Sequence, residues 1–170
     1  ADVDYVMKMK EHLGLNLNPT VYLSGGTIGS KELFPVFELL LDQGNLINVI
    51  VNCGRNEMLC NLMLRAAERT NADNVKLYVS ADVDAEDTLL AADCIITIYD
   101  STLIYRAFLT GIPVIAFAPD NGAEKADLAY LKDKGLIYFA EDYNHVIIGM
   151  YDVLQSNLGK QLSENALMRT

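Results

Sequence analysis

The chain has 170 residues, of which 51% are apolar and 21% are charged, so intrinsic disorder is excluded and one domain with a sizeable core is expected. Its 13 Lys and Arg residues against 23 Asp and Glu residues give a net charge of −10. A chain this acidic is a poor partner for DNA, RNA or anionic lipid, so nucleic-acid binding is disfavoured.

The cysteine and histidine residues indicate neither a disulfide framework nor a metal site. Cys53, Cys60 and Cys94 are odd in number and lie in apolar segments, which is typical of reduced, buried thiols in a cytosolic protein. His12 and His145 have no Cys or His at ligand spacing and are interpreted as surface helix residues. No apolar run approaches the ~18 residues of a membrane helix, and the first residues lack a signal-peptide pattern. We therefore expect a cytoplasmic location.

Short β-branched runs alternate with longer amphipathic runs, and this alternation indicates the fold class. A leading helix is predicted over residues 3–13, with Tyr5, Val6, Met9 and Leu13 on one face. In chain order, the sequence then predicts a strand at 20–24, a helix at 30–43, a strand at 47–52, a helix at 57–70, a strand at 75–79, a helix at 84–92, a strand at 94–98, a helix at 102–110, a strand at 113–117, a helix at 123–134, a strand at 136–139 and a helix at 144–154.

Strands that are each followed by a helix require right-handed crossovers, which place the strands in a parallel sheet. The predicted strands are nearly continuous apolar runs, as expected when helices cover both faces. The predicted fold class is therefore α/β, a Rossmann-like, doubly wound, parallel six-stranded sheet. We expect a linker and leading helix at 1–18, the Rossmann-like domain at 19–157, and a polar tail or docking helix at 158–170.

A ligand site is expected beyond the carboxyl ends of the strands, where the strand order reverses. With the Rossmann-type order 3-2-1-4-5-6, this crevice lies between strands one and four. The loops that would line it are 24–30 and 99–102, flanked by 53–57, 80–84 and 118–124. Polar residues and glycines concentrate in these loops, which supports a binding function.

The first of these loops reads Ser24-Gly25-Gly26-Thr27-Ile28-Gly29-Ser30 and opens the first crossover helix. Its glycines would let backbone amides approach an anion at a helix N-terminus, and a diphosphate is the natural candidate. A tight strand-to-helix turn needs glycine even without a ligand, so both interpretations stay open.

The loop Cys53-Gly54-Arg55-Asn56-Glu57 ends the second strand. Asn56 can cap the following helix, and Arg55 could pair with a phosphate in bidentate fashion.

The loop after the fourth strand contains Asp100, Ser101 and Thr102. Ser101 or Asp100 could be a helix cap, whereas Tyr99, Tyr105 and Arg106 could contact a base or sugar. The two tyrosines could instead be partly buried against the next helix. The stretch Pro119-Asp120-Asn121-Gly122 is a turn signal, and Glu124 either complements a helix dipole or accepts a sugar hydroxyl.

Five motifs in order and spacing carry a family resemblance. They read Leu13-Gly14-Leu15, the strand into Ser24-Gly25-Gly26, Cys53-Gly54-Arg55-Asn56, Ala92-Asp93-Cys94-Ile95-Ile96-Thr97 and Gly111-Ile112-Pro113-Val114-Ile115. Over about residues 10–155, the chain resembles the C-terminal, nucleotide-sugar-binding half of family 28 GT-B glycosyltransferases. The Cys-Gly-Arg-Asn loop resembles the diacylglycerol branch of that family.

The resemblance implies one half of a two-domain enzyme, in which this half binds a UDP-sugar and a missing N-terminal half binds the acceptor and supplies the catalytic base. It implies that Gly25 and Gly26 meet the diphosphate and that the backbone of 81–83 reads the uracil. It implies no metal, no cofactor besides the donor, and membrane contact only through the missing half, at the cytoplasmic membrane face. The expected nucleotide-sugar site comprises Gly25, Gly26, Thr27, Gly29, Arg55, Asn56, Ala81, Asp82, Val83, Ser101, Thr102, Arg106, Gly122 and Glu124.

Three departures from the family pattern fall in this site. The family's glycine-rich turn after the fourth strand reads Tyr99-Asp100-Ser101-Thr102 here. The glutamate that grips the ribose hydroxyls aligns with Arg106, and the glutamine of the Pro-Gly-Gln-Glu loop is replaced by Ala123, although Gly122 and Glu124 remain. Arg106 is expected to pair with a donor phosphate, with a carboxylate on an unusual sugar or, with slight preference, with Asp100. The sequence therefore leaves two hypotheses: the donor half of an inverting hexosyltransferase with a lipid-type acceptor, inactive alone, or a diverged, non-catalytic interaction or regulatory module. A free-standing NAD-binding domain is disfavoured, because no acidic residue follows the second strand.

Overall fold

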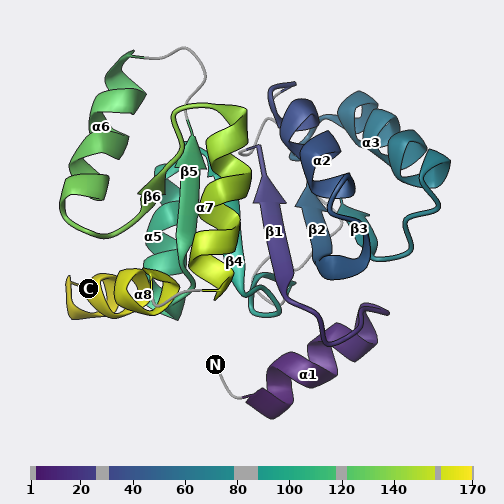
Figure 1. Cartoon of the computed structure of the whole chain (residues 1–170), viewed down its shortest axis with the longest axis horizontal. Coiled ribbons are helices and arrows are strands. Elements are labelled where there is room, and N and C mark those ends of the chain that lie inside the picture. The colour runs from purple at the N-terminus through teal and green to yellow at the C-terminus, as the bar shows by residue number, and fades with distance from the viewer. Residues whose placement is uncertain (1–2, 26–30, 79–87, 118–121, 156–157, 170) are drawn as a thin grey trace. The chain divides into compact units, whose positions relative to one another are not determined.

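The computed structural model describes residues 3–25, 31–78, 88–117, 122–155 and 158–169 (Figure 1). Helices and strands alternate along these ranges as the sequence predicts. Their bounds are α1 Val3–His12, β1 Thr20–Ser24, α2 Leu33–Leu41, the 3-10 helix η1 Gly44–Leu46, β2 Asn48–Asn52, α3 Glu57–Arg69, β3 Val75–Tyr78, β4 Cys94–Ile98, α5 Ser101–Thr110, β5 Val114–Phe117, α6 Gly122–Asp133, β6 Tyr138–Phe139, α7 Tyr143–Gln155 and α8 Leu158–Arg169. The helix predicted at 84–92 falls largely outside the described residues.

The strand order is β3-β2-β1-β4-β5-β6, which is the predicted Rossmann-type order. Within each part of the sheet the strands are parallel, with Ser24 opposite Asn52 in the β1–β2 pair and Ile98 opposite Phe117 in the β4–β5 pair. The predicted fold class is confirmed. By internal contacts, the chain divides into unit 1, residues 1–93, and unit 2, residues 94–170, and the two units are described separately.

Unit 1 contains β1, β2 and β3, with α2 and α3 packed beside each other on the strands. Every residue of β1 is buried, which agrees with its uniformly apolar or small composition. Leu33, Val36 and Phe37 on α2 are fully buried and form part of the core. The apolar side chains therefore place the core of unit 1 between the strands and these two helices.

Helix α1 joins the rest of unit 1 through a buried lysine. Lys10 is 6% exposed, and its Nζ donates to Asp93 Oδ2 at 3.1 Å and to the Asn18 carbonyl at 3.2 Å. Asp93 Oδ2 also accepts the amide of Thr20, the first residue of β1, at 2.7 Å. Of the predicted apolar face of this helix, Val6, Met9 and Leu13 are half-buried, whereas Tyr5 is 39% exposed. Lys10, between Val6 and Leu13 on that face, is the residue that the helix buries most.

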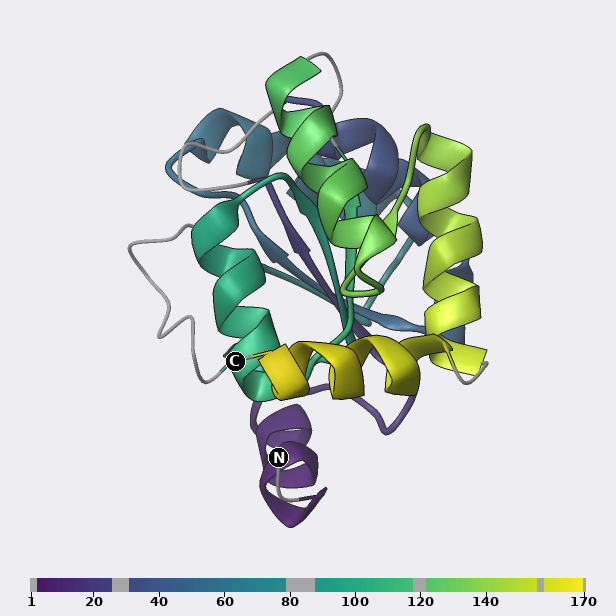
Figure 2. The ribbon, with the colours of Figure 1, turned by 90° about the vertical axis from the view of Figure 1, so that its left-hand side faces the viewer.

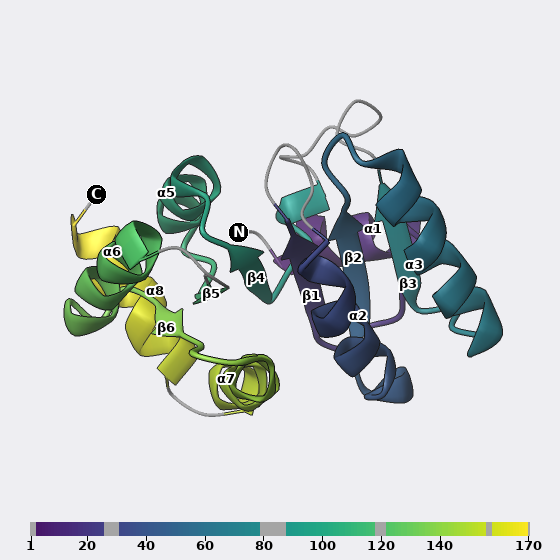
Figure 3. The same cartoon turned by 90° about the horizontal axis from the view of Figure 1, so that it is seen from above.

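Unit 2 contains β4, β5 and β6 and the helices α5 to α8. Helices α5 and α7 cover opposite faces of β4 and β5 (Figure 3). Helix α8 follows α7 and packs against both α5 and α7 (Figure 2). A Cβ at Gly149 of α7 would lie 2.5 Å from the ring of Tyr138, so the absence of a side chain permits β6 and α7 to pack closely.

The three cysteines are free, as expected, but only Cys53 and Cys94 are buried. Cys60 is half-buried on α3, so the prediction of a buried thiol is wrong at this position. Its neighbour Leu59 faces the core instead, because the helical period turns consecutive residues about 100° apart. His12 and His145 are exposed on α1 and α7, which confirms their interpretation as surface residues.

Candidate functional site

The carboxyl edge of unit 1 begins where β1 ends at Ser24, which is 4% exposed. Gly25 follows in a buried position. The expected ligand residues Gly26, Thr27 and Gly29, together with 81–83, lie outside the described residues. The anion-binding role of the first glycine loop therefore stays a prediction.

The turn after β2 is fastened to the sheet by Asn52, a residue that the sequence analysis did not select. Its Nδ2 donates to the hydroxyl of Tyr22 on β1 at 3.0 Å, and its Oδ1 accepts the amide of Gly54 at 2.9 Å. Gly54 has φ +63°, a left-handed conformation that favours glycine. An Asn at the end of a strand directly before a Cys-Gly turn is the sequence signal that could have indicated this contact.

Asn56, predicted both as a helix cap and as a member of the nucleotide-sugar site, caps helix α3. Its Oδ1 accepts the amide of Leu59 at 2.9 Å, three residues into the helix. Arg55, one residue before the cap, is exposed, and no hydrogen bond or ion pair joins its guanidinium to another described residue. The arrangement presents a cation beside a helix N-terminus, and both features favour an anion.

Cys53 lies inside this turn and is fully buried. Burial, followed by a hydrogen bond with Cys60 and repulsion from the Cys60 thiolate, raises the pKa of Cys53 far above its usual value. Cys53 is therefore protonated at neutral pH. Nucleophilic cysteines and cysteine metal ligands are thiolates, so Cys53 is interpreted as a packing residue.

The carboxyl edge of unit 2 begins after β4 with a helix cap. Asp100 Oδ1 accepts the amides of Thr102 and Leu103 at 3.1 and 3.2 Å, so Asp100 is the N-cap of α5. Ser101 and Thr102 occupy the first turn of α5 and are exposed. The two side chains are therefore accessible on this unit, whereas the amides of Thr102 and Leu103 already donate to the Asp100 carboxylate.

The expected ion pair between Arg106 and Asp100 does not form. Asp100 uses its carboxylate to cap α5, and the cap directs the oxygen toward backbone amides. Arg106 is half-buried on the same helix, and its guanidinium makes no ion pair or hydrogen bond with another described residue. The preferred interpretation of Arg106 is wrong, because the Asp100 carboxylate accepts hydrogen bonds from nearby backbone amides instead.

Tyr99 and Glu124 lie at the same edge of unit 2. The Tyr99 hydroxyl donates to Asp127 Oδ2 at 3.2 Å, and burial, followed by the charge of Asp127, raises the pKa of Tyr99. Glu124 is half-buried in the first turn of α6, which begins at Gly122. Tyr105, by contrast, is 59% exposed, so packing against the next helix is wrong for this tyrosine.

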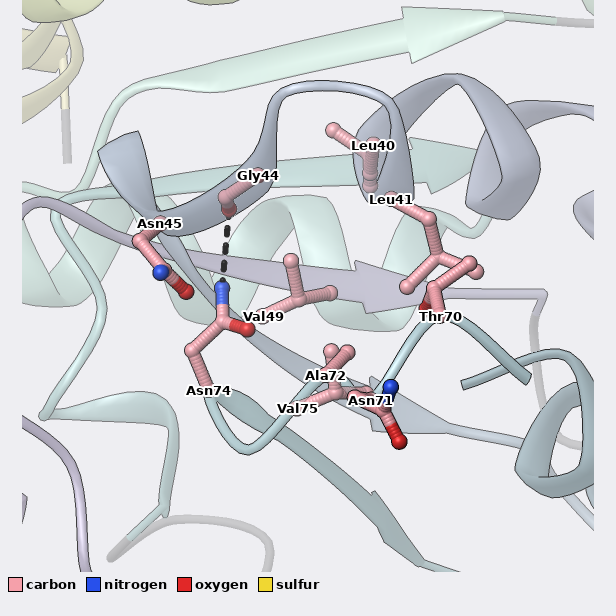
Figure 4. A pocket seen from close by; sticks show the side chains of 10 residues that line it. All are labelled: Leu40, Leu41, Gly44, Asn45, Val49, Thr70, Asn71, Ala72, Asn74 and Val75. Carbon is pink, nitrogen blue, oxygen red and sulfur yellow. Dashed lines mark hydrogen bonds between the residues drawn. The ribbon is translucent and has the colours of Figure 1, made fainter. Parts of the chain in front are cut away.

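A cavity of about 140 Å³ lies at the opposite, amino-terminal edge of unit 1 (Figure 4). Asn74 crosses it and donates to the carbonyl oxygens of Gly44 and Ile47 at 3.1 and 2.5 Å. These hydrogen bonds attach η1 and the residue after it to the residue that precedes β3. We therefore interpret the cavity as structural and do not assign it a ligand. Among the described residues, no group of three or more His, Cys, Asp or Glu could hold a metal ion.

Two curated glycolipid enzymes are similar to the chain in sequence. It is 29% identical over 173 residues to monogalactosyldiacylglycerol synthase 3 of Arabidopsis thaliana, with 94% of the chain and 36% of that protein covered. It is 30% identical over 146 residues to the processive diacylglycerol β-glucosyltransferase of Bacillus subtilis, with 85% and 37% covered. The chain is a GT-B domain related to glycolipid-synthesising glycosyltransferases. The resemblance predicted from the motifs is thereby confirmed.

Solved structures share the fold of this GT-B domain. The C-terminal CMP-Kdo binding domain of WaaA from Acinetobacter baumannii matches with a TM-score of 0.68 and 11% identity, over 97% of both chains. Anabaena Alr3699/HepE, solved in complex with UDP-glucose, matches with a TM-score of 0.70 and 16% identity, over 99% of this chain and 48% of that one. No protein-family model matches the sequence.

The GT-B domain spans little more than a third of the length of these curated relatives. Within the described ranges, none of its helices is both long enough and apolar enough to cross a membrane.

Proposed function

We propose that this GT-B domain is the donor half of an inverting glycosyltransferase that transfers a hexose from a UDP-sugar to a lipid-type acceptor. The observation that carries the proposal is the sequence similarity to two enzymes named for diacylglycerol glycosylation, over 85% or more of the chain. Anabaena Alr3699/HepE, which shares this fold over 48% of its chain and was solved in complex with UDP-glucose, supports the choice of donor.

The chemistry expected at this half is stabilisation of the leaving diphosphate. When an acceptor hydroxyl attacks the anomeric carbon, the bond from that carbon to the donor phosphate breaks and negative charge grows on the diphosphate. Amides at a helix N-terminus stabilise such charge, and Arg55 supplies a full positive charge beside the N-terminus of α3. Leaving-group stabilisation of this kind needs no metal. The acceptor, its binding half and the catalytic base belong to the proposed full-length enzyme.

Titration calorimetry of the purified chain with UDP, UDP-glucose, UDP-galactose and CMP tests the donor. We expect the three uridine nucleotides to bind and CMP to bind more weakly. Arg55→Ala should weaken UDP binding about tenfold, the loss of one charged hydrogen-bonding group. Arg65→Ala removes an exposed arginine further along α3, away from the turn that holds Arg55, and is the matched control, expected to leave UDP affinity unchanged. Preference for CMP, or equal losses in both variants, would contradict the proposed donor site.

The second candidate is a diverged, non-catalytic interaction module, and the observation that favours it is Arg106. A guanidinium has hydrogen-bond donors and no acceptor, so Arg106 cannot accept the two ribose hydroxyls that the family glutamate would accept. If the donor site works with this arginine, Arg106→Glu should lower UDP affinity. If the site has decayed, the parent should bind UDP weakly and Arg106→Glu should raise the affinity. Absence of binding by both proteins at millimolar UDP would favour the interaction module.

A further inference from the structure

Asn52 connects two neighbouring strands and a turn within unit 1. It is the last residue of β2 and lies opposite Ser24, the last residue of β1. Its amide nitrogen donates to the Tyr22 hydroxyl, whose ring is 3% exposed, and its carbonyl oxygen accepts the Gly54 amide. One carboxamide therefore joins a buried tyrosine of β1 to the second residue of the turn that follows β2.

The turn fixed in this way carries the candidate phosphate ligand. It is closed by the Asn56 amide, which donates to the Cys53 carbonyl at 3.3 Å. The Asn56 side chain then caps α3, so both ends of the turn are attached, one to the sheet and the other to the helix. Arg55 lies between these attachments and is exposed. Its backbone direction is consequently determined by the contacts of its neighbours.

We propose that Asn52 is a positioning residue which, through Tyr22 and Gly54, sets the direction in which Arg55 extends toward the donor diphosphate. The inference rests on the proposed function for the identity of the ligand. The residue type fits the role, because Asn has both a donor for the tyrosine oxygen and an acceptor for the glycine amide. A leucine of similar size has neither, so the turn would lose its attachment to β1.

The first experiment measures the attachment without any ligand. Amide hydrogen exchange, followed by NMR in the purified chain, should show Gly54 exchanging at least about tenfold faster in Asn52→Leu. Tyr22→Phe preserves the ring and removes only the hydroxyl, so it should give a smaller increase in Gly54 exchange. This variant tests the same attachment if Asn52→Leu folds poorly. Asn61→Leu makes the same replacement at an exposed position of α3 and is the matched control. Unchanged Gly54 exchange in both Asn52→Leu and Tyr22→Phe would overturn the inference.

The second experiment is a double-mutant cycle on UDP affinity. Asn52→Leu alone should weaken UDP binding about fivefold to tenfold, whereas in an Arg55→Ala background it should have no further effect, because its action passes through Arg55. A general structural defect would instead lower affinity by the same factor in both backgrounds, and that additive result would overturn the positioning role alone. Failure of the parent to bind UDP would overturn the proposed function, and the role of Asn52 would fall with it.

Discussion

The buried ion pair between α1 and the sheet of unit 1 predicts an asymmetric response to mutation. The Lys10 side chain is 8% exposed, whereas that of Asp93 is 41% exposed, and the charged atoms are 3.1 Å apart. Removing the carboxylate leaves an ammonium group in a site with one remaining carbonyl acceptor. Removing the lysine leaves a carboxylate that still contacts water and still accepts the Thr20 amide. Asp93→Ala should therefore destabilise the chain more than Lys10→Met.

The magnitudes follow from the partners that each substitution leaves behind. Loss of one member of a buried pair costs about 3–5 kcal/mol, and the partial exposure of Asp93 places Asp93→Ala near the lower limit, at about 3 kcal/mol. Lys10→Met leaves a solvated acid and replaces a buried cation by an apolar chain of similar length, so we expect about 1 kcal/mol or less. In the Lys10→Met background, Asp93→Ala should cost about 1–2 kcal/mol, for the unpaired Thr20 amide alone.

Urea unfolding followed by circular dichroism provides the assay, with free energies obtained by linear extrapolation. The Asp93→Ala and Lys10→Met single variants and the double variant form a cycle with an expected coupling of about 1–2 kcal/mol. A Lys10→Met variant that is as destabilised as Asp93→Ala, or a coupling near zero, would refute the assignment of a buried cation that depends on this carboxylate.

Three further outcomes are expected. Gly149→Ala should destabilise the chain by about 2 kcal/mol, because the new Cβ would lie 2.5 Å from the Tyr138 ring. Gly44→Ala meets open space but has φ +62°, so it should cost about 1 kcal/mol, and urea unfolding compares the two variants. The raised pKa of Tyr99 means that the fold favours the neutral phenol, so its contribution to stability is present below the unfolded value near 10.0 and is lost as the pH rises through the folded value. In an ultraviolet titration, Asp127→Asn should lower the Tyr99 pKa only partly, since burial is the larger cause, and a complete return would contradict this. The purified 170-residue chain should neither transfer sugar nor hydrolyse UDP-sugar at a detectable rate by chromatography, and robust turnover would overturn the assignment of a donor half.

The positions of strands and helices could be predicted because they depend on local patterns. The run at 20–24 and the run at 94–98 became β1 and β4 with the predicted bounds, since each is continuously apolar or small; the first lies between Pro19 and Gly25, and the second follows Asp93. The parallel arrangement was also predictable, because helices between successive strands favour parallel crossovers. The strand order was assumed from the Rossmann type of fold, and the structure confirms it.

Contacts between distant residues could not be predicted in the same way. Lys10 is an apparent surface residue until its partner is known, and that partner lies 83 positions away. The cap formed by Asp100 was one of two alternatives, and the sequence preferred a pair with Arg106 that does not form. In both cases the outcome depended on which partner the backbone brought closest. The residues of the glycine loop and the domain boundaries stay predictions.

The short strand β6 has a consequence for behaviour in concentrated solution. It lies at one end of the strand order and comprises Tyr138 and Phe139 alone, paired with Ile115 and Ala116 of β5. An edge strand exposes unpaired amide and carbonyl groups that can recruit a strand from another molecule, and longer edges recruit more strongly. Two residues offer very few such groups, so this end of the sheet is a poor template for β-aggregation.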